Sequence, residues 1–228
     1  MALKAMIFDV DGTLVDTNRV HVEAWWRAFQ RCGYEVPVSR IAPEIGKGGD
    51  MLVPAVLGEA AEKESGEALR NYHNQEFLDM AAHEHFEIFP RIADLFRTLH
   101  ERGLKVALAT SAKPKQLEAI EKSARIEFQP LVDLIVTAEA AEKSKPAPDI
   151  IAVTVKKLGL PPQQCAMVGD SPYDAQASRD ADVICFGVLT GGFSREKLLQ
   201  AGVVAVWQDT ADLLKHLDVT LGRATANA

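Results

Sequence analysis

Short apolar runs alternate with stretches of helical length along most of this chain, and that alternation limits the fold more than any other feature. Five such runs follow residue 86, each composed mostly of residues that favour β-strands: Val106–Ala109, Leu134–Val136, Ala166–Val168, Val183–Phe186 and Val203–Val206. Runs of this length are typical of strands buried on both faces of a parallel sheet. Stretches with helical period separate them, near residues 91–102, 114–124, 148–159, 172–181, 194–201 and 209–217. The pattern predicts an α/β fold with a doubly wound, Rossmann-like parallel sheet.

A long helical segment interrupts this alternation after the first predicted strand, Ala5–Val10. Residues from about 18 to 84 keep helical periodicity with no β-rich run among them. One stripe of this segment supplies its expected core: Val22, Trp25, Trp26 and Phe29. We therefore expect a small α-helical cap domain over residues 17–85, inserted into a catalytic core of residues 1–16 and 86–228. Such an insert can move over the core as a lid.

Composition excludes several classes of protein. The chain has 228 residues, 47% of them hydrophobic, and its 25 Lys and Arg against 32 Asp and Glu give a net charge of −7. Nucleic acids and anionic membrane surfaces are bound mainly through clustered basic residues, so we expect neither as a partner. The three cysteines form no Cys-x-x-Cys pair, which argues against a zinc knuckle or a disulfide scaffold.

The termini and apolar runs carry no targeting signal that we can identify. The N-terminus lacks a signal-peptide pattern, and no run approaches the roughly 20 apolar residues of a membrane span. The expected location is therefore cytoplasmic, and the sequence leaves monomer and homodimer equally open. A small-residue tail, Gly222–Ala228, is expected to fray.

Residues able to do chemistry follow four of the predicted strands. They are Asp9 and Asp11, Thr110 and Ser111, Lys145, and Asp170 with Asp174. Taken singly, each has an ordinary explanation: an Asp-Gly turn, a helix N-cap, a solvated lysine, or acids at a helix start. Because the carboxyl ends of parallel strands meet at one edge of a sheet, we expect these side chains to gather in one place.

Carboxylates gathered in this way repel one another and lose hydration unless a cation offsets their charge. Hard oxygen ligands without His or Cys favour Mg²⁺. A metal beside a lysine and a hydroxyl binds the oxygens of a phosphoryl group, and a carboxylate in line with it can act as the nucleophile. The residues therefore indicate phosphoryl transfer from a small phosphorylated molecule, through an aspartyl-phosphate.

Four segments resemble, in order and spacing, the motifs of the haloacid dehalogenase-like (HAD) hydrolase superfamily, in the branch with an α-helical cap. They are Asp9-Val10-Asp11-Gly12-Thr13, Thr110, Lys145 and Gly169-Asp170-Ser171-x-x-Asp174. The resemblance covers nearly the whole chain. It implies that Asp9 attacks phosphorus and that Asp11 protonates the leaving alcohol and later activates water. It also implies two ligand sets: Asp9, the Asp11 carbonyl and Asp170 with Asp174 for Mg²⁺, and Thr110, Ser111 and Lys145 for the phosphoryl oxygens.

Residues also separate the activities within this superfamily. Asp11, a second acid two positions after the nucleophile, favours phosphate esters over haloacids and phosphonates. The chain is similar to the phosphoglycolate phosphatase and β-phosphoglucomutase-like branch, whose mutases use a cap arginine to grip a second phosphate. Residues 45–51 contain no arginine. We expect a Mg²⁺-dependent phosphatase of small phosphate monoesters, phosphoglycolate or a sugar phosphate, with a sugar-phosphate mutase as the alternative and a non-catalytic binding protein as a third hypothesis.

Three cap residues are candidate substrate contacts: Lys47, His21 and Arg19. Glycines at 46, 48 and 49 form a loop that can bring Lys47 over the core site when the lid closes, where it could replace the mutase arginine less specifically. The alternative interpretation of all three is cap-surface charge.

Overall fold

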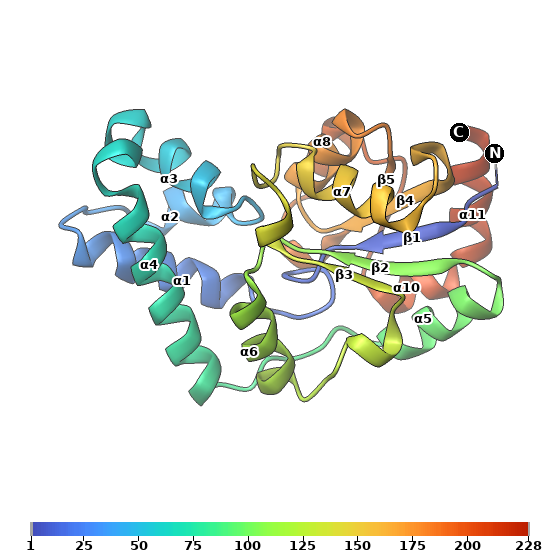
Figure 1. Cartoon of the computed structure of the whole chain (residues 1–228), viewed down its shortest axis with the longest axis horizontal. Coiled ribbons are helices and arrows are strands. Elements are labelled where there is room, and N and C mark those ends of the chain that lie inside the picture. The colour runs from blue at the N-terminus through green and yellow to red at the C-terminus, as the bar shows by residue number, and fades with distance from the viewer. Residues whose placement is uncertain (1, 228) are drawn as a thin grey trace.

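Six strands form one sheet at the centre of the molecule, in the order β3-β2-β1-β4-β5-β6, and all of them are parallel (Figure 1). The computed structural model describes residues 2–227. The strands are β1 (Ala5–Phe8), β2 (Lys105–Ala109), β3 (Leu134–Val136), β4 (Cys165–Gly169), β5 (Ile184–Val188) and β6 (Val206–Trp207). The strand order reverses direction between β1 and β4, which is where ligands bind in open α/β sheets. The doubly wound α/β prediction is confirmed.

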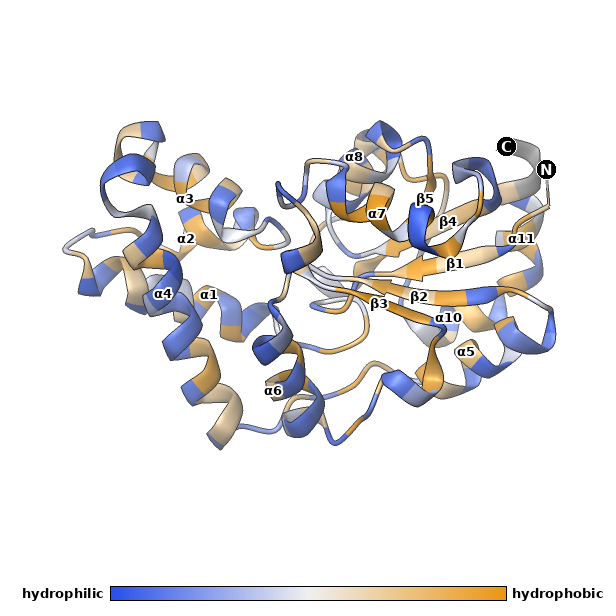
Figure 2. Cartoon of the chain, viewed as in Figure 1, coloured by the Kyte–Doolittle hydropathy of each residue, from blue (hydrophilic) through white to orange (hydrophobic). Residues whose placement is uncertain are grey.

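Helices cover both faces of the sheet. One face carries α5 (Ile92–Glu101), α6 (Pro114–Ala124), α10 (Thr210–Lys215) and α11 (Leu217–Asn227), and the other carries α7 (Asp149–Leu158), α8 (Pro172–Asp180) and α9 (Arg195–Ala201). Successive strand residues pack into opposite layers: Phe8 contacts Phe96 of α5 with ring centroids 5.0 Å apart, whereas Ile7 joins the layer of α7. Strands β1 and β2 accordingly stand out as hydrophobic in Figure 2.

The segment between β1 and α5 is helical throughout its regular elements, as the sequence predicts. It comprises α1 (Asn18–Arg31), α2 (Val38–Ile41), the 3-10 helix η1 (Ala42–Glu44), α3 (Gly49–Leu57) and α4 (Glu59–His83). Trp25, Phe29 and Leu69 belong to a hydrophobic cluster of its own, whereas Val20 and Phe77 join the cluster of the core. Below, "cap" denotes residues 17–85 and "core" the rest, the division that we propose from the sequence.

Two local expectations are wrong. In the run Val203–Val206 the strand begins only at Val206, because β6 is an edge strand that pairs with β5 at two positions. Val203 precedes the strand and packs in the hydrophobic cluster between the sheet and α7–α9. The tail predicted to fray instead continues α11 to Asn227, where Ala224 is buried in the core; Ala228 lies outside the described residues. In the described part of the chain, no helix combines the length and the apolar character that a bilayer crossing needs.

The remaining regular elements are short 3-10 helices that connect strands to helices. They are η2 (Gln129–Leu131), η3 (Ala138–Ala140), η4 (Pro162–Gln164) and η5 (Leu189–Gly191). The last of them follows β5 at the same sheet edge as the predicted site, so its backbone helps to enclose that edge.

Candidate active site

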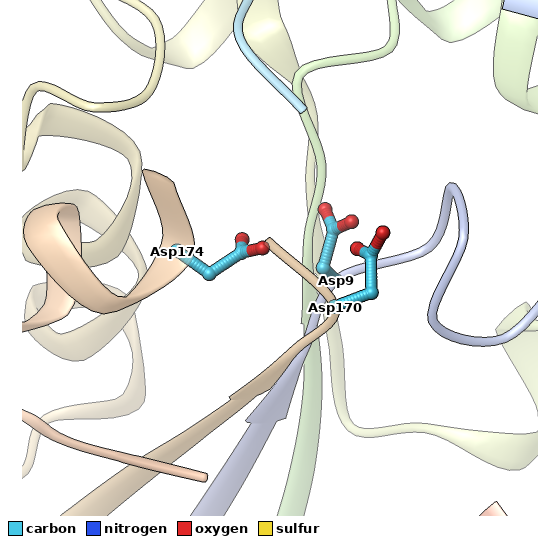
Figure 3. A group of neighbouring side chains, drawn as sticks. All are labelled: Asp9, Asp170 and Asp174. Carbon is cyan, nitrogen blue, oxygen red and sulfur yellow. The ribbon is translucent and has the colours of Figure 1, made fainter. Parts of the chain in front are cut away.

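Three carboxylates meet at the carboxyl ends of β1 and β4 (Figure 3). Asp9 follows β1, Asp170 follows β4, and Asp174 lies in the first turn of α8 with its carboxylate pointing toward the other two. One oxygen of each lies within 4.8 Å of the others, and all three residues are buried. We call Asp9, Asp170 and Asp174 the acid cluster. Parallel pairing of β1 with β4 brings its members together, since Phe8 stands opposite Val168.

Lys145 neutralises part of the charge of the acid cluster. Its ammonium, 1% exposed, donates to Asp9 Oδ1 at 2.5 Å and to Asp174 Oδ1 at 2.7 Å. Burial disfavours the charged lysine, but the two carboxylates outweigh burial and raise the pKa of Lys145, so it stays protonated. Three carboxylates around one ammonium leave two negative charges, which one divalent cation would offset.

The pKa values of the acids show the same deficit of positive charge. Burial raises the pKa of Asp9 well above its ordinary range, and the neighbouring acids add to this effect while Lys145 opposes it. Burial and the charge of Asp174 raise the pKa of Asp170 to about 7. Oxygen donors of this kind, buried together and short of positive charge, fit Mg²⁺.

Two side-chain hydrogen bonds and the close approach of one glycine fix the position of the Asp170 carboxylate. Thr13 Oγ1 and Asn18 Nδ2 donate to its two oxygens at 3.1 and 3.0 Å. A Cβ atom on Gly191 would lie 1.8 Å from Asp170 Oδ2, so only glycine fits at the end of η5. Asn18 begins α1, and the first turn of the cap therefore holds a side chain of the core.

Asp11 lies outside the acid cluster. Its carboxylate accepts from Thr17 Oγ1 at 2.6 Å and from Thr110 Oγ1 at 3.4 Å, and contacts His21 Nε2 at 3.0 Å. Burial alone would raise the pKa of Asp11, but His21 and the Thr17 hydroxyl lower it below its ordinary value. The carboxylate of Asp11, a residue predicted as a metal ligand, is therefore not part of the group of described acids that could hold a metal ion.

A pair of histidines connects Asp11 to the cap. His21 Nδ1 lies 3.2 Å from His73 Nε2, and His73 stacks on Trp25 with ring centroids 4.1 Å apart. Burial, with His21 and Lys113 adding to it, lowers the pKa of His73 well below 6.5. His73 is therefore neutral, and one of the two facing ring nitrogens donates while the other accepts.

A cavity of about 150 Å³ lies between cap and core, and five of the ten predicted site residues line it. Asp9, Asp11 and Ser111 line it from the core, and His21 and Lys47 from the cap. Ser111 Oγ is buried there without a hydrogen-bond partner. An unpaired buried hydroxyl on a residue that lines a cavity is the kind of donor that a phosphoryl oxygen can satisfy once a ligand reaches it.

Other predicted residues take different places. Thr110 is fully buried beside Asp11, and its hydroxyl also accepts from the backbone of Ala112 at 2.9 Å. Lys47 lines the cavity but forms an ion pair with Glu44 inside its own loop. Arg19 is 71% exposed, pairs with Glu84, and does not line the cavity, so the structure does not place it with the site.

Among the cavity-lining residues that sequence reasoning missed are Arg70, His73, Asn74 and Lys113. Three of them lie on α4, where the 70, 73, 74 spacing puts their side chains on one face. The spacing was a usable signal, but nothing in the sequence says that this face meets the core. Lys113 follows the Thr110-Ser111 motif directly and was the easier residue to find.

Comparisons with known proteins agree with this geometry. Residues 3–182 match the family described as "Hydrolase: haloacid dehalogenase-like hydrolase". A hydrolase of known structure from Pseudomonas syringae is 30% identical with a TM-score of 0.87, covering 95% of this chain and 98% of that one. The phosphoglycolate phosphatase of Escherichia coli (strain K12) is 26% identical over an alignment 238 positions long, which covers 94% of this chain and 92% of the enzyme.

A further relative is a much longer protein. Protein SUPPRESSOR OF QUENCHING 1, chloroplastic, from Arabidopsis thaliana is 30% identical over 213 residues, which make up 92% of this chain but 20% of the plant protein. The shared part is thus one unit of that relative. Since the family match takes in β1, the helical insertion, β4 and the acid cluster, the chain belongs to the haloacid dehalogenase-like hydrolases.

Proposed function

We propose that this protein is a Mg²⁺-dependent phosphatase that hydrolyses small phosphate monoesters through a phosphorylated Asp9. One observation carries the proposal: the acid cluster, two negative charges in excess of Lys145, is buried beside a cavity that Asp9 itself lines. Asp9 is the only member of the acid cluster that lines the cavity among the described residues, which suits it to the nucleophile's position.

The residues present suit a resident Mg²⁺. Asp9, Asp170 and the Asp11 carbonyl would hold the ion, and Asp174 would support them. When bound, the ion would supply positive charge to the phosphoryl oxygens and to the acids that hold it. Lys145 would supply a second positive charge to the same oxygens, and the unpaired Ser111 hydroxyl would donate a hydrogen bond to one of them. The Thr110 hydroxyl, which bonds Asp11 in this structure, would have to change its partner to do the same.

The reaction divides between two acids. The Asp9 carboxylate forms a bond to phosphorus while the bond from phosphorus to the leaving oxygen breaks. Asp11 gives that oxygen a proton, which it takes up from its contact with His21 because the pKa of Asp11 is low. Asp11 then takes a proton from water, whose oxygen attacks phosphorus and frees Asp9 and inorganic phosphate. Thr17 and His21 hold the Asp11 carboxylate in place for both halves of this cycle.

The substrate class follows from the cavity and from the relatives. A volume of about 150 Å³ accepts a benzene-sized molecule, which favours small esters. The Escherichia coli phosphoglycolate phosphatase, similar over most of both chains, supports phosphoglycolate as a substrate, and a small sugar phosphate is the second candidate. A mutase would need a group to grip a second phosphate, and the only cation of residues 45–51, Lys47, is paired with Glu44.

Replacing Asp9 tests the proposal. We expect Asp9→Asn to lower phosphate release by about 1,000-fold or more, since the nucleophile is removed, with an unchanged circular dichroism spectrum. EDTA should stop the wild type, and Mg²⁺ should restore it. Asp16→Asn, an exposed acid of the same loop, is the matched control and should keep full activity.

Three outcomes would overturn the proposal. An Asp9→Asn variant that keeps most of its rate would exclude a phosphorylated Asp9 as the reaction intermediate. Isomerisation of glucose 1-phosphate only after priming with a bisphosphate, without net phosphate release, would identify a mutase. Inactivity of the wild type on a broad panel of phosphate esters with Mg²⁺ would favour the non-catalytic binding protein.

A further inference from the structure

The cap contributes one continuous polar face to the cavity. Arg70, His73 and Asn74 lie on the same side of α4 and all line the cavity; we call them the cap wall. His73 is occupied by His21 and Trp25, as described above. Arg70 and Asn74 are the two members of the cap wall whose polar groups have no role in the proposed reaction.

Arg70 is held so that part of its guanidinium stays available. Nη1 donates to both carboxylate oxygens of Glu62, at 2.6 and 2.8 Å, so the ion pair uses one of its three nitrogens. The side chain is 29% exposed. Its stem passes over the start of α3, where a Cβ atom on Gly49 would lie 2.8 Å from Arg70 Cγ. Glutamate and glycine therefore fix the direction of Arg70 and leave Nε and Nη2 for another oxygen.

A second cation faces the cavity from the core. Lys113 lines it from the start of α6, and within the described part of the chain Lys113 forms no ion pair. It lies close enough to His73 to contribute to the fall in that residue's pKa. Asp50, an acid of the cavity lining, is occupied by the backbone N–H of Ser144 at 3.2 Å. Besides Lys47, which pairs with Glu44, the cap thus presents Arg70 and the core presents Lys113 to a single small cavity.

Unpaired polar atoms mark the same cavity. Among the described residues, four buried side-chain polar atoms have no hydrogen-bond partner: Asn74 Oδ1, Ser111 Oγ, Ser178 Oγ and Trp207 Nε1. Two of them, on Asn74 and Ser111, belong to residues that line the cavity. Buried polar atoms are nearly always paired. The Ser111 hydroxyl is therefore a donor still without an acceptor, whereas Asn74 Oδ1 is an acceptor and calls for a donor rather than an oxyanion.

We propose that Arg70 and Lys113 form a subsite for an oxyanion on the alcohol part of the substrate, beside the Asn74 amide. This inference rests on the proposed function and narrows its substrate class. Arginine recognises carboxylate and phosphate through its planar fork, and an ester with a carboxylate fits the small cavity better than one with a second phosphate. The substrate is therefore the phosphate ester of a small hydroxy acid rather than of an uncharged alcohol.

Three esters and four variants test the subsite. We compare phosphoglycolate, ethyl phosphate, which lacks the carboxylate, and propane-1,3-diol bisphosphate. Arg70→Ala should lower kcat/KM for phosphoglycolate by about 10- to 100-fold, as for loss of a charged hydrogen bond, and leave ethyl phosphate nearly unchanged. Lys113→Ala should do the same to a smaller extent, and Arg70→Lys should retain part of the preference. Arg31→Ala removes a cap arginine that pairs with Glu76 outside the cavity and should change nothing.

Each contrary outcome has one meaning. Equal losses on phosphoglycolate and ethyl phosphate would overturn the subsite and leave Arg70 a structural role. A loss confined to the bisphosphate would overturn the carboxylate in favour of a second phosphate. If the wild type hydrolyses none of the esters, the proposed function fails, and calorimetry on the Asp9→Asn protein still decides the subsite: phosphoglycolate must bind more tightly than ethyl phosphate, and Arg70→Ala must abolish that difference.

Discussion

The acid cluster draws its parts from distant segments, whereas the cap wall takes Arg70, His73 and Asn74 from one helix. Lys145 and Asp9 are 136 residues apart in sequence, yet their side chains meet in the fully buried interior. The ion pairs of the two basic cap residues that line the cavity are local by comparison: Arg70 pairs with Glu62 eight residues away, and Lys47 with Glu44 three residues away. Charges held by the sheet cannot rearrange without loss of the fold, whereas charges held within a helix or loop can differ between relatives at little cost. The first arrangement suits chemistry and the second suits choice of substrate.

Replacing Lys145 should have the largest effect and breaks the acid cluster itself. Lys145→Met leaves Asp9 and Asp174 without their partner, and removing one member of a buried ion pair costs about 3–5 kcal/mol of unfolding free energy. Urea unfolding in EDTA measures this loss, and Mg²⁺ should recover part of it. Lys143→Met, an exposed lysine of the same loop, is the control. An unfolding free energy equal to that of the wild type would contradict the role of Lys145 as the partner that Asp9 and Asp174 share.

Replacing Asp170 should have the opposite effect on stability. Asp170→Asn removes one of the repelling carboxylates, so the metal-free protein should gain about 1–2 kcal/mol at pH 8 while Mg²⁺-dependent activity is lost. The pKa of Asp170 rises on folding from 3.8 to about 7, so the folded state binds more protons between these values. Stability of the metal-free wild type therefore falls as pH rises through that window, and falls less in the variant. Destabilisation of the metal-free variant would refute this account; Asp16→Asn is again the control.

His73 offers a smaller effect, on the cap side. Its pKa lies well below 6.5 in the folded protein, so below pH 6.5 the unfolded chain takes up a proton that the folded chain does not. The free energy of unfolding should then decrease as the pH is lowered below 6.5, by at most about 1.4 kcal/mol per pH unit, and His73→Gln should lack this contribution. Unfolding curves at pH 7 and pH 5 for both proteins give the difference, with the exposed His83→Gln as control. Parallel pH dependence of wild type and variant would contradict a neutral buried His73.

Lys47 should have the smallest effect. Because it pairs with Glu44 in its own loop and contacts the Tyr173 ring at 4.7 Å, Lys47→Ala should change kcat/KM by less than about threefold. A much larger loss would make Lys47 a substrate contact and place it beside Arg70 and Lys113 among the cations that bind the substrate. Steady-state rates on phosphoglycolate and ethyl phosphate decide between these outcomes.

The core site was largely predictable because its residues follow strands whose ends must meet. Asp9 and Asp170 come directly after buried apolar runs, and in a parallel sheet that position alone brings them to one edge. Asp174 shows that two explanations can both hold. It caps the start of α8 through Ser171, as an acid at a helix start does, and its other oxygen binds Lys145.

The cap site was not predictable in the same way. Helical periodicity indicated helices over residues 18–84, but the polar residues of a helix face either water or another element, and periodicity does not say which. The contact between His21 and His73 joins residues 52 positions apart on two helices, α1 and α4, and only their packing decides it. Arg19 was predicted as a substrate contact for this reason: it lies two residues before His21 on α1, yet its side chain faces solvent.

The sequence by itself determined the class of fold, the helical insertion and the chemistry of the acid cluster, because apolar period and strand-end position depend only on local order. Tertiary structure alone decided which carboxylates gather around Lys145, which face of the cap meets the core, and which buried polar atoms have no hydrogen-bond partner. These depend on how strands and helices pack at distances of a few ångströms between residues far apart in the chain. The same separation explains why the proposed reaction follows from motifs in the sequence, whereas the proposed substrate class depends on the residues that line the cavity.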